Sequence, residues 1–85
     1  MKKGLAEEPP KSEALTDYDR AQITLYLRLL DAEAESADWR EVCQVLFELD
    51  PKRDPNLARA VYESHFARAK WILEHGYKDL LRRDL

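Results

Sequence analysis

The chain has 85 residues and a net charge of −3 at neutral pH, with 45% hydrophobic and 36% charged residues. A chain this short forms one domain at most, but its apolar content is that of a folded protein. Its single cysteine excludes an internal disulfide, and no apolar run approaches the roughly 20 residues that cross a bilayer. The N-terminus has no apolar stretch typical of a signal peptide. We therefore expect one small cytoplasmic domain.

Residues 1–14 are predicted to form a disordered N-terminal tail, and residues 15–83 to form the folded domain. The tail offers little apolar surface to bury, and Pro9 and Pro10 disfavour a helix. Thr16 is a good N-cap for a first helix that extends to about Ser36. Its apolar residues share one face at helical spacing. These are Tyr18, Leu25, Leu29 and Ala32.

A second, short helix is predicted to begin at Asp38, with Glu41 three residues later completing a capping box. It ends before Pro51, which disfavours helical geometry in the preceding residue. Asp54 caps a third helix, Pro55 occupies its first position, and it extends to about His75.

Gly76 would stop the third helix, and residues 77–83 would add a short helical turn. The pattern therefore predicts an all-α fold of three helices, with a turn of about six residues between the second and the third, which is the outline of a helix-turn-helix. Other three-helix bundles have the same outline.

The first and third helices each carry a second apolar stripe beside the main one. A surface helix normally has a single stripe. Both helices could be central in a small bundle, or part of the second stripe could stay exposed and dock a partner. On the second interpretation the docking residues would be Leu27, Leu30, Tyr62, Phe66, Ala69 and Leu73.

Charge bears on what the partner could be. Residues 17–38 contain six acidic residues and two arginines, whereas a DNA-binding domain usually presents a basic face. The third helix and the turn before it offer a small set of polar and basic residues for reading DNA. These are Lys52, Arg53, Asn56 and Arg59. The acidic balance argues against tight, independent DNA binding.

Catalytic and metal sites are not indicated, so we expect neither an enzyme nor a cofactor-binding protein. His65 and His75 have no cysteine at zinc-ligand spacing, and the chain lacks a glycine-rich phosphate loop. Cys43 falls on the apolar stripe of the second helix and is predicted to be a buried small hydrophobic residue. His65 is predicted to be packed and hydrogen-bonded.

Five segments occur in an order that resembles a known family. They are YLRLLDAEA (26–34), DWREV (38–42), DPKRDP (50–55), SHFARAKW (64–71) and HGY (75–77). The series resembles a proteobacterial domain-of-unknown-function family common on integrative and conjugative elements. In that family the domain forms the C-terminal half of excision activators such as FseA, and it also occurs alone in QseM-like antiactivators.

The resemblance implies a helix-turn-helix variant whose lengthened turn corresponds to residues 49–54. It also implies a function in transcription regulation, horizontal gene transfer and quorum sensing. The acidic charge and the short segment before Thr16 are more similar to the stand-alone antiactivator than to the activator. Trp39, Asp50, Pro51, Trp71 and Gly76 would set the fold.

An antiactivator of this kind would act by protein–protein interaction. It would bind the N-terminal domain of an FseA-like activator as a mimic of the activator's own C-terminal domain, with a LuxR-type quorum-sensing regulator as a second partner. The alternative is a small DNA-binding transcriptional regulator whose third helix is the recognition helix. A homodimer through the apolar stripes is a third possibility, and we expect a monomer.

Overall fold

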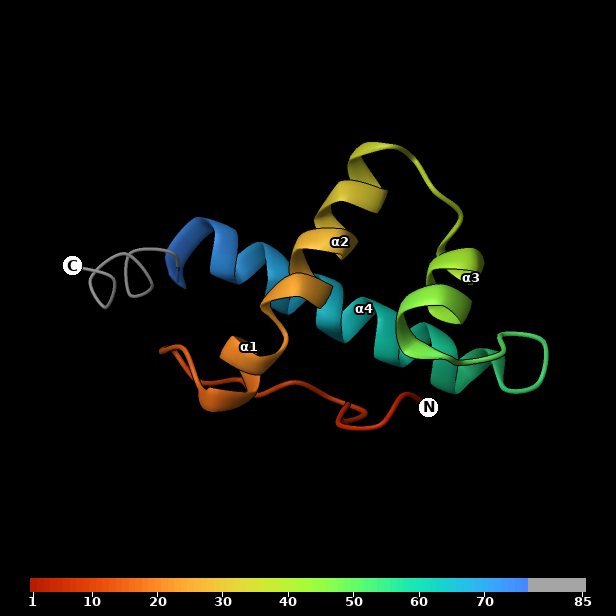
Figure 1. Ribbon diagram of the computed structural model, residues 1–85, viewed down its shortest axis with the longest axis horizontal. Coiled ribbons are helices and arrows are strands. Elements are labelled where there is room, and N and C mark those ends of the chain that lie inside the picture. The colour runs from red at the N-terminus through yellow and green to blue at the C-terminus, as the bar shows by residue number, and fades with distance from the viewer. Residues whose placement is uncertain (77–85) are drawn as a thin grey trace.

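The computed structural model describes residues 1–76, so the helical turn expected at residues 77–83 lies outside the described residues. This part of the chain contains helices and loops, and no strand. The elements are α1 (Asp17–Ala21), α2 (Ile23–Ala34), α3 (Trp39–Val42), the π-helix η1 (Cys43–Phe47), α4 (Pro55–Trp71) and the π-helix η2 (Ile72–Gly76). In sequence η1 directly continues α3 and η2 directly continues α4 (Figure 1). Within residues 1–76, no helix is both long and apolar enough to span a membrane.

The single first helix expected from Thr16 to Ser36 is wrong, because the structure divides it into α1 and α2. Thr16 caps α1 as predicted: its hydroxyl accepts from the Asp19 amide, and the Asp19 carboxylate accepts from the Thr16 amide. The helix stops at Gln22, whose φ of −106° and ψ of 16° depart from helical geometry. The chain then changes direction into α2 (Figure 1). Apolar spacing runs on through this break, so the pattern alone did not reveal it.

Two helix ends use a left-handed residue that is not glycine. Glu48 follows η1 with a φ of 54°, and the Leu49 amide donates to the Cys43 carbonyl over 3.1 Å. Ser36 follows α2 with a φ of 58°. Backbone bonds of this kind satisfy carbonyls that a helix end leaves free. The second helix therefore ends at Phe47, before the boundary expected at Asp50–Pro51.

Residues 48–54 form the extended turn between η1 and α4. The Asp50 carboxylate accepts from the Lys52 amide over 2.9 Å, and Pro51, in the same turn, is buried. Asp54 caps α4 by accepting from the Leu57 amide, and Pro55 occupies the first helical position. The cap at Asp54 and the position of Pro55 were predicted from the sequence. The result is a helix-turn-helix in which α3 and η1 form the first helix and α4 the second.

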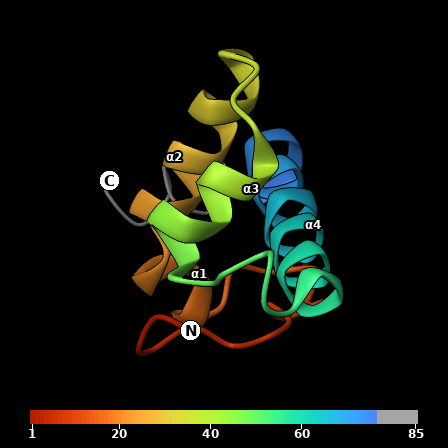
Figure 2. The same ribbon diagram turned by 90° about the vertical axis from the view of Figure 1, so that its right-hand side faces the viewer.

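The core lies where α2 and the α3–η1 segment pack against α4 (Figure 2). Its largest wholly buried side chains include Phe47, Leu29, His65 and Val61. Because α2 and α4 pack along each other and their most apolar faces meet there, both helices are central in the bundle. The buried hydrophobic residues are Leu15, Leu25, Tyr26, Leu29, Val42, Cys43, Leu46, Phe47, Ala58, Val61, Tyr62, Ala69 and Ile72.

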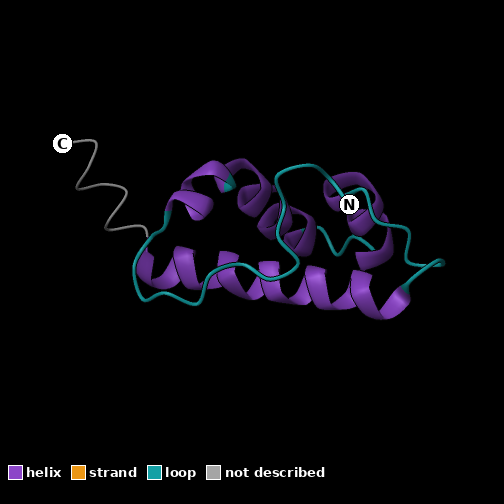
Figure 3. Cartoon of the chain, turned by 90° about the horizontal axis from the view of Figure 1, so that it is seen from below, coloured by secondary structure: helices purple, strands orange, loops and turns teal. Residues whose placement is uncertain are grey.

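Residues 1–14, expected as a disordered tail, instead run beside α4 (Figure 3). Pro9 is buried, and the Ala6 amide donates to the Tyr18 hydroxyl over 3.1 Å. The Arg68 guanidinium donates to the carbonyl oxygens of Ser12, over 2.6 Å, and Ala14, over 3.0 Å. The expectation considered only apolar burial, whereas backbone groups of this segment also form hydrogen bonds with the side chains of Tyr18 and Arg68.

Candidate functional site

Cys43 and His65 are packed core groups. The Cys43 thiol is fully buried and donates to the Ala58 carbonyl, and burial raises its pKa to about 11. His65 is also fully buried: Nδ1 lies 2.9 Å from the Val61 carbonyl and Nε2 lies 2.7 Å from the Tyr18 hydroxyl. A carbonyl can only accept, so Nδ1 carries the proton and Nε2 accepts from Tyr18. Burial lowers the pKa of His65 and favours this neutral form.

The described residues 1–76 contain no cluster of three or more histidine, cysteine or acidic side chains that could hold a metal ion. Neither buried group is exposed to a solvent-borne substrate. The thiol is protonated at neutral pH, and thiolate is the reactive form of cysteine. Neither Cys43 nor His65 is therefore placed to react with a substrate from solution.

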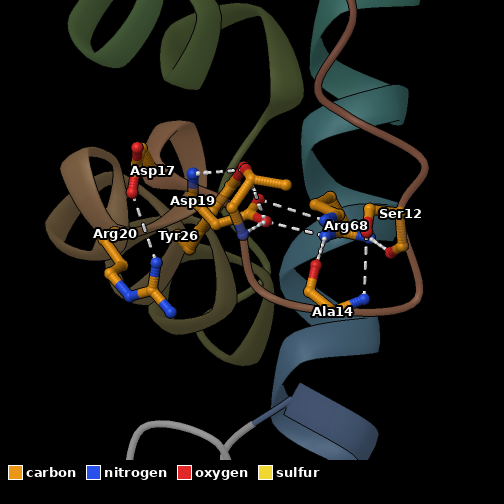
Figure 4. Close-up of polar contacts among 8 residues, drawn as sticks. Ser12, Ala14, Asp17, Asp19, Arg20, Tyr26 and Arg68 are labelled. Carbon is orange, nitrogen blue, oxygen red and sulfur yellow. Dashed lines mark hydrogen bonds and ion pairs between the residues drawn. The ribbon is translucent and has the colours of Figure 1, made fainter. Parts of the chain in front are cut away.

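A buried ion pair joins α1 to α4 (Figure 4). Arg68 donates to both carboxylate oxygens of Asp19, over 3.0 and 2.7 Å, and the Asp19 side chain is completely buried. The Tyr26 hydroxyl donates to the same carboxylate. Burial alone would raise the pKa of Asp19, but the hydrogen bond from Arg68 and the other donors together hold it below its ordinary value.

The sequence analysis did not identify this pair. Arg68 follows Val61 by seven residues and His65 by three, so its position on the helix was a usable signal of burial. Its guanidinium makes four hydrogen bonds, two to Asp19 and two to backbone carbonyls. Because its donors are directed at these internal acceptors, Arg68 holds the fold together and is not free to bind an external anion.

The structure divides the proposed docking residues between core and surface. Tyr62 and Ala69 are buried, so they belong to the core and not to an exposed face. Leu27 and Leu73 are 62% and 60% exposed. Leu30 is half-buried between these extremes.

Leu27, Leu30, Ala69 and Leu73 line part of a hollow of about 120 Å3 between α2 and the end of α4. Phe66 is half-buried and stacks on Tyr62 with ring centroids 6.0 Å apart, and neither ring lines that hollow. The six predicted residues therefore do not form one surface. Their role in binding a partner stays a prediction.

A second group of exposed residues lies at the N-terminal end of α4. Lys52 and Arg53 are exposed in the turn, and Asn56 and Arg59 are exposed on the first turns of the helix. The Arg59 guanidinium lies 4.8 Å from the centre of the Trp39 ring, and the Arg40 guanidinium lies 5.1 Å from the centre of the same ring. The structure thus brings the four predicted residues to one end and adds Arg40, which the sequence analysis missed.

Trp39 is the aromatic residue that both Arg40 and Arg59 contact at this end of the molecule. It is half-buried at the start of α3, where it packs against Tyr62 with ring centroids 6.2 Å apart. A cation over an indole ring is stabilised by the ring's electron-rich face. Arg59 also donates to Glu63 over 2.7 Å. Its guanidinium is thereby positioned at the surface without being buried.

Three acidic residues of this end accept backbone hydrogen bonds, and one of them, Asp38, also pairs with Arg40 over 3.7 Å. Asp38 accepts from the Arg40 amide, Asp50 from the Lys52 amide and Asp54 from the Leu57 amide. These carboxylates cap helices or close the turn. Lys52 and Arg53 have no carboxylate within 4.0 Å among residues 1–76, so their charges face solvent without an ion-pair partner there. The basic residues of this end, Arg40, Lys52, Arg53 and Arg59, are all exposed.

Comparison with known families shows the family of the chain. A family model described as T6SS, Transcription factor, DNA binding domain (RovC_DNA-bd) matches residues 1–82. No curated protein matches the chain. The family match spans almost the whole sequence, including the segment before α1, and the chain belongs to this family.

This membership bears on the earlier expectations. A relation to transcription factors agrees with the predicted class of function. The specific resemblance to FseA-like and QseM-like domains is not confirmed, and the match gives the antiactivator hypothesis no support. The DNA-binding alternative agrees with it better.

Proposed function

Because the chain belongs to a family of transcription-factor DNA-binding domains, we propose that it binds double-stranded DNA as a transcriptional regulator. The binding element is the helix-turn-helix formed by α3 with η1, residues 48–54 and α4. The observation that carries the proposal is the exposed N-terminal end of α4, where a basic turn adjoins two side chains suited to base recognition. This geometry agrees with the family membership.

In this proposal the first turns of α4 enter the major groove, which is wide enough for an α-helix. Asn56 and Arg59 are the base-reading residues, since asparagine pairs well with the edge of adenine and arginine with that of guanine. Both side chains are exposed on one face of α4. Glu63 follows one turn later and is paired with Arg59, so the reading face is confined to the start of the helix.

Phosphate contacts come from residues that flank this helix end. Lys52 and Arg53 precede α4 in the turn, and Arg40 projects from the start of α3 onto the Trp39 ring. In helix-turn-helix proteins the first helix crosses the DNA backbone while the second lies in the groove. In this proposal Arg40 therefore lies beside the phosphate backbone of one DNA strand. Lys52 and Arg53 in the turn lie beside the phosphates near the N-terminus of α4.

The net charge of −3 sets the character of the interaction. Because the whole chain is negatively charged, its long-range attraction to DNA is weak. Affinity therefore depends on the basic cluster formed by Arg40, Lys52, Arg53 and Arg59. Each neutralised phosphate contributes about 0.9 to the slope of log affinity against log salt. Three phosphate contacts, from Arg40, Lys52 and Arg53, contribute about −3 to this slope, and any further phosphate contact makes it steeper. We expect moderate affinity that falls steeply with salt.

The test is equilibrium binding to labelled duplexes recovered by selection from a random-sequence pool, measured by fluorescence anisotropy over a salt series. Asn56→Ala and Arg59→Ala should each cost about tenfold or more against the selected duplex and much less against an unrelated one. Lys52→Gln with Arg53→Gln should weaken binding to both duplexes and reduce the salt slope by about 2.

Arg28→Gln is the matched control, because Arg28 is an exposed arginine on α2 outside the cluster. It should leave affinity close to that of the wild-type chain. Failure of the selection to enrich any duplex, or variants in the cluster that bind as tightly as the control, would contradict the proposal.

Protein docking is the second candidate function, and one observation favours it: Leu27 and Leu73 are exposed on either side of an apolar hollow. An antiactivator would use this surface on the N-terminal domain of an excision activator, and such binding would tolerate salt. The purified chain should then bind that domain, and Leu27→Ser with Leu73→Ser should abolish the binding. Binding to the selected duplex alone would reject this candidate.

A further inference from the structure

The first three residues of the chain lie beside the end of the helix-turn-helix that carries the basic cluster. The Lys2 amide donates to the carbonyl of Phe47 over 2.8 Å. Phe47 is the last residue of η1, directly before the turn that leads into α4. The N-terminus therefore lies beside the end of η1, far along the sequence from it.

A tight turn holds this end in place. The Leu5 amide donates to the Lys2 carbonyl over 3.3 Å, and Gly4 between them has a φ of 89°. A side chain at Gly4 would be strained in that backbone region. Leu5 then packs against the hydrophobic core. The position of residues 1–3 is thus set by the hydrogen bond from Lys2 on one side of the turn and by the packing of Leu5 on the other.

The rest of the segment is held by contacts with α1 and α4. Ala6 bonds to Tyr18, Pro9 is buried, and Arg68 holds the carbonyls of Ser12 and Ala14. Flexible arms lose conformational entropy when they bind, at a cost of order 1 kcal/mol or more per residue. Anchoring of this segment in the free protein removes much of that cost.

Charge is unevenly distributed along the segment. Lys2 and Lys3 are exposed, and among residues 1–76 neither has a carboxylate within 4.0 Å. Glu7 and Glu8 follow, and they line a hollow against the flank of α4. Glu8 also pairs with Lys11 over 3.0 Å. The unpaired positive charge is therefore confined to the end beside the turn.

We propose that residues 1–3 form a basic arm that places Lys2 and Lys3 on the DNA phosphates flanking the N-terminus of α4. This inference rests on the proposed function, because it extends the same interface. When α4 lies in the major groove, a phosphate backbone passes along each side of the helix. The turn with Lys52 and Arg53 meets one part of that backbone. The arm, joined to the end of η1, adds two further cations to the same end of the domain.

The test compares a double variant, Lys2→Gln with Lys3→Gln, with the wild-type chain on the selected duplex. Two lost phosphate contacts should reduce the salt slope by about 1.8. Between about 50 and 200 mM salt, the wild-type chain should then lose about tenfold more affinity than the variant. The weakening should be equal on an unrelated duplex, since phosphate contacts carry no sequence information.

The matched control, Lys11→Gln with Arg28→Gln, removes two positive charges outside the cluster and should keep the wild-type slope. Lys2→Arg with Lys3→Arg should also keep it, because the charge remains. An unchanged slope in the double glutamine variant, with weakened binding by Lys52→Gln and Arg53→Gln, would overturn the arm and leave the proposed function standing. Absence of DNA binding by the wild-type chain would overturn both.

Discussion

Replacing Arg68 by methionine should bring this small domain close to unfolding. The substitution keeps much of the side chain's bulk but leaves the Asp19 carboxylate completely buried without its cation. Breaking a buried ion pair from one side typically costs about 3–5 kcal/mol. A domain of 85 residues has a total free energy of unfolding of about 4–13 kcal/mol. The loss is therefore a large part of the whole, and the carbonyls of Ser12 and Ala14 lose their donor as well.

The assay is urea denaturation followed by circular dichroism. Asp17→Asn is the matched control: Asp17 pairs with Arg20 at 3.4 Å but is fully exposed, and exposed pairs contribute about 0–1 kcal/mol. Arg68→Met combined with Asp19→Leu removes both charges and should recover part of the stability. If Arg68→Met alone costs less than about 1 kcal/mol, the ion pair does not hold α1 and α4 together as described.

Three further predictions concern the core. The free energy of unfolding should fall as pH drops below 6.5, the ordinary pKa of histidine, because burial lowers the pKa of His65 and the unfolded chain binds the proton more readily. His65→Gln should flatten this pH profile, and an unchanged profile would contradict the buried neutral histidine. Cys43, with a pKa of about 11, should react with a thiol reagent only after denaturation, so rapid labelling of the native protein would refute its burial. Leu29→Ala should cost about 2–5 kcal/mol in urea denaturation, whereas a cost near zero would place Leu29 outside the core.

Local signals in the sequence predicted much of the fold. Thr16, Asp38 and Asp54 cap helices as expected, and Pro55 begins α4. Each of these signals acts over three or four residues, so neighbouring sequence is enough to interpret it. The order of the later helices and the turn before α4 followed from them, whereas the helix-turn-helix variant was inferred from the resemblance to a family.

Features that depend on distant partners were missed. Asp19 and Arg68 are 49 residues apart, and only the packed structure shows that their charges meet inside the protein. The break at Gln22 is invisible to helical spacing, which continues across it. Ser36 and Glu48 adopt left-handed geometry that sequence reasoning normally assigns to glycine, so the exact helix ends were not predicted.

In the candidate site, too, residues close together in sequence were predicted and a residue joined through a distant contact was missed. Lys52, Arg53, Asn56 and Arg59 were identified because they lie close together in sequence, around the start of one helix. Arg40 joins them through the Trp39 ring, which stands between two helices. The docking residues were predicted from helical stripes, and a stripe cannot tell the core side from the solvent side. Burial of Tyr62 and Ala69 decided that question.

The central claim is tested most directly by the affinity of the wild-type chain and of Arg59→Ala for a selected duplex and an unrelated one, measured over the same salt series. The proposed DNA-binding function predicts that the wild-type chain prefers the selected duplex, with affinity that falls steeply as salt rises. Arg59→Ala should lose most of that preference and keep the weaker, sequence-independent binding. Equal affinity of the wild-type chain for both duplexes, or no binding to either, would contradict the account.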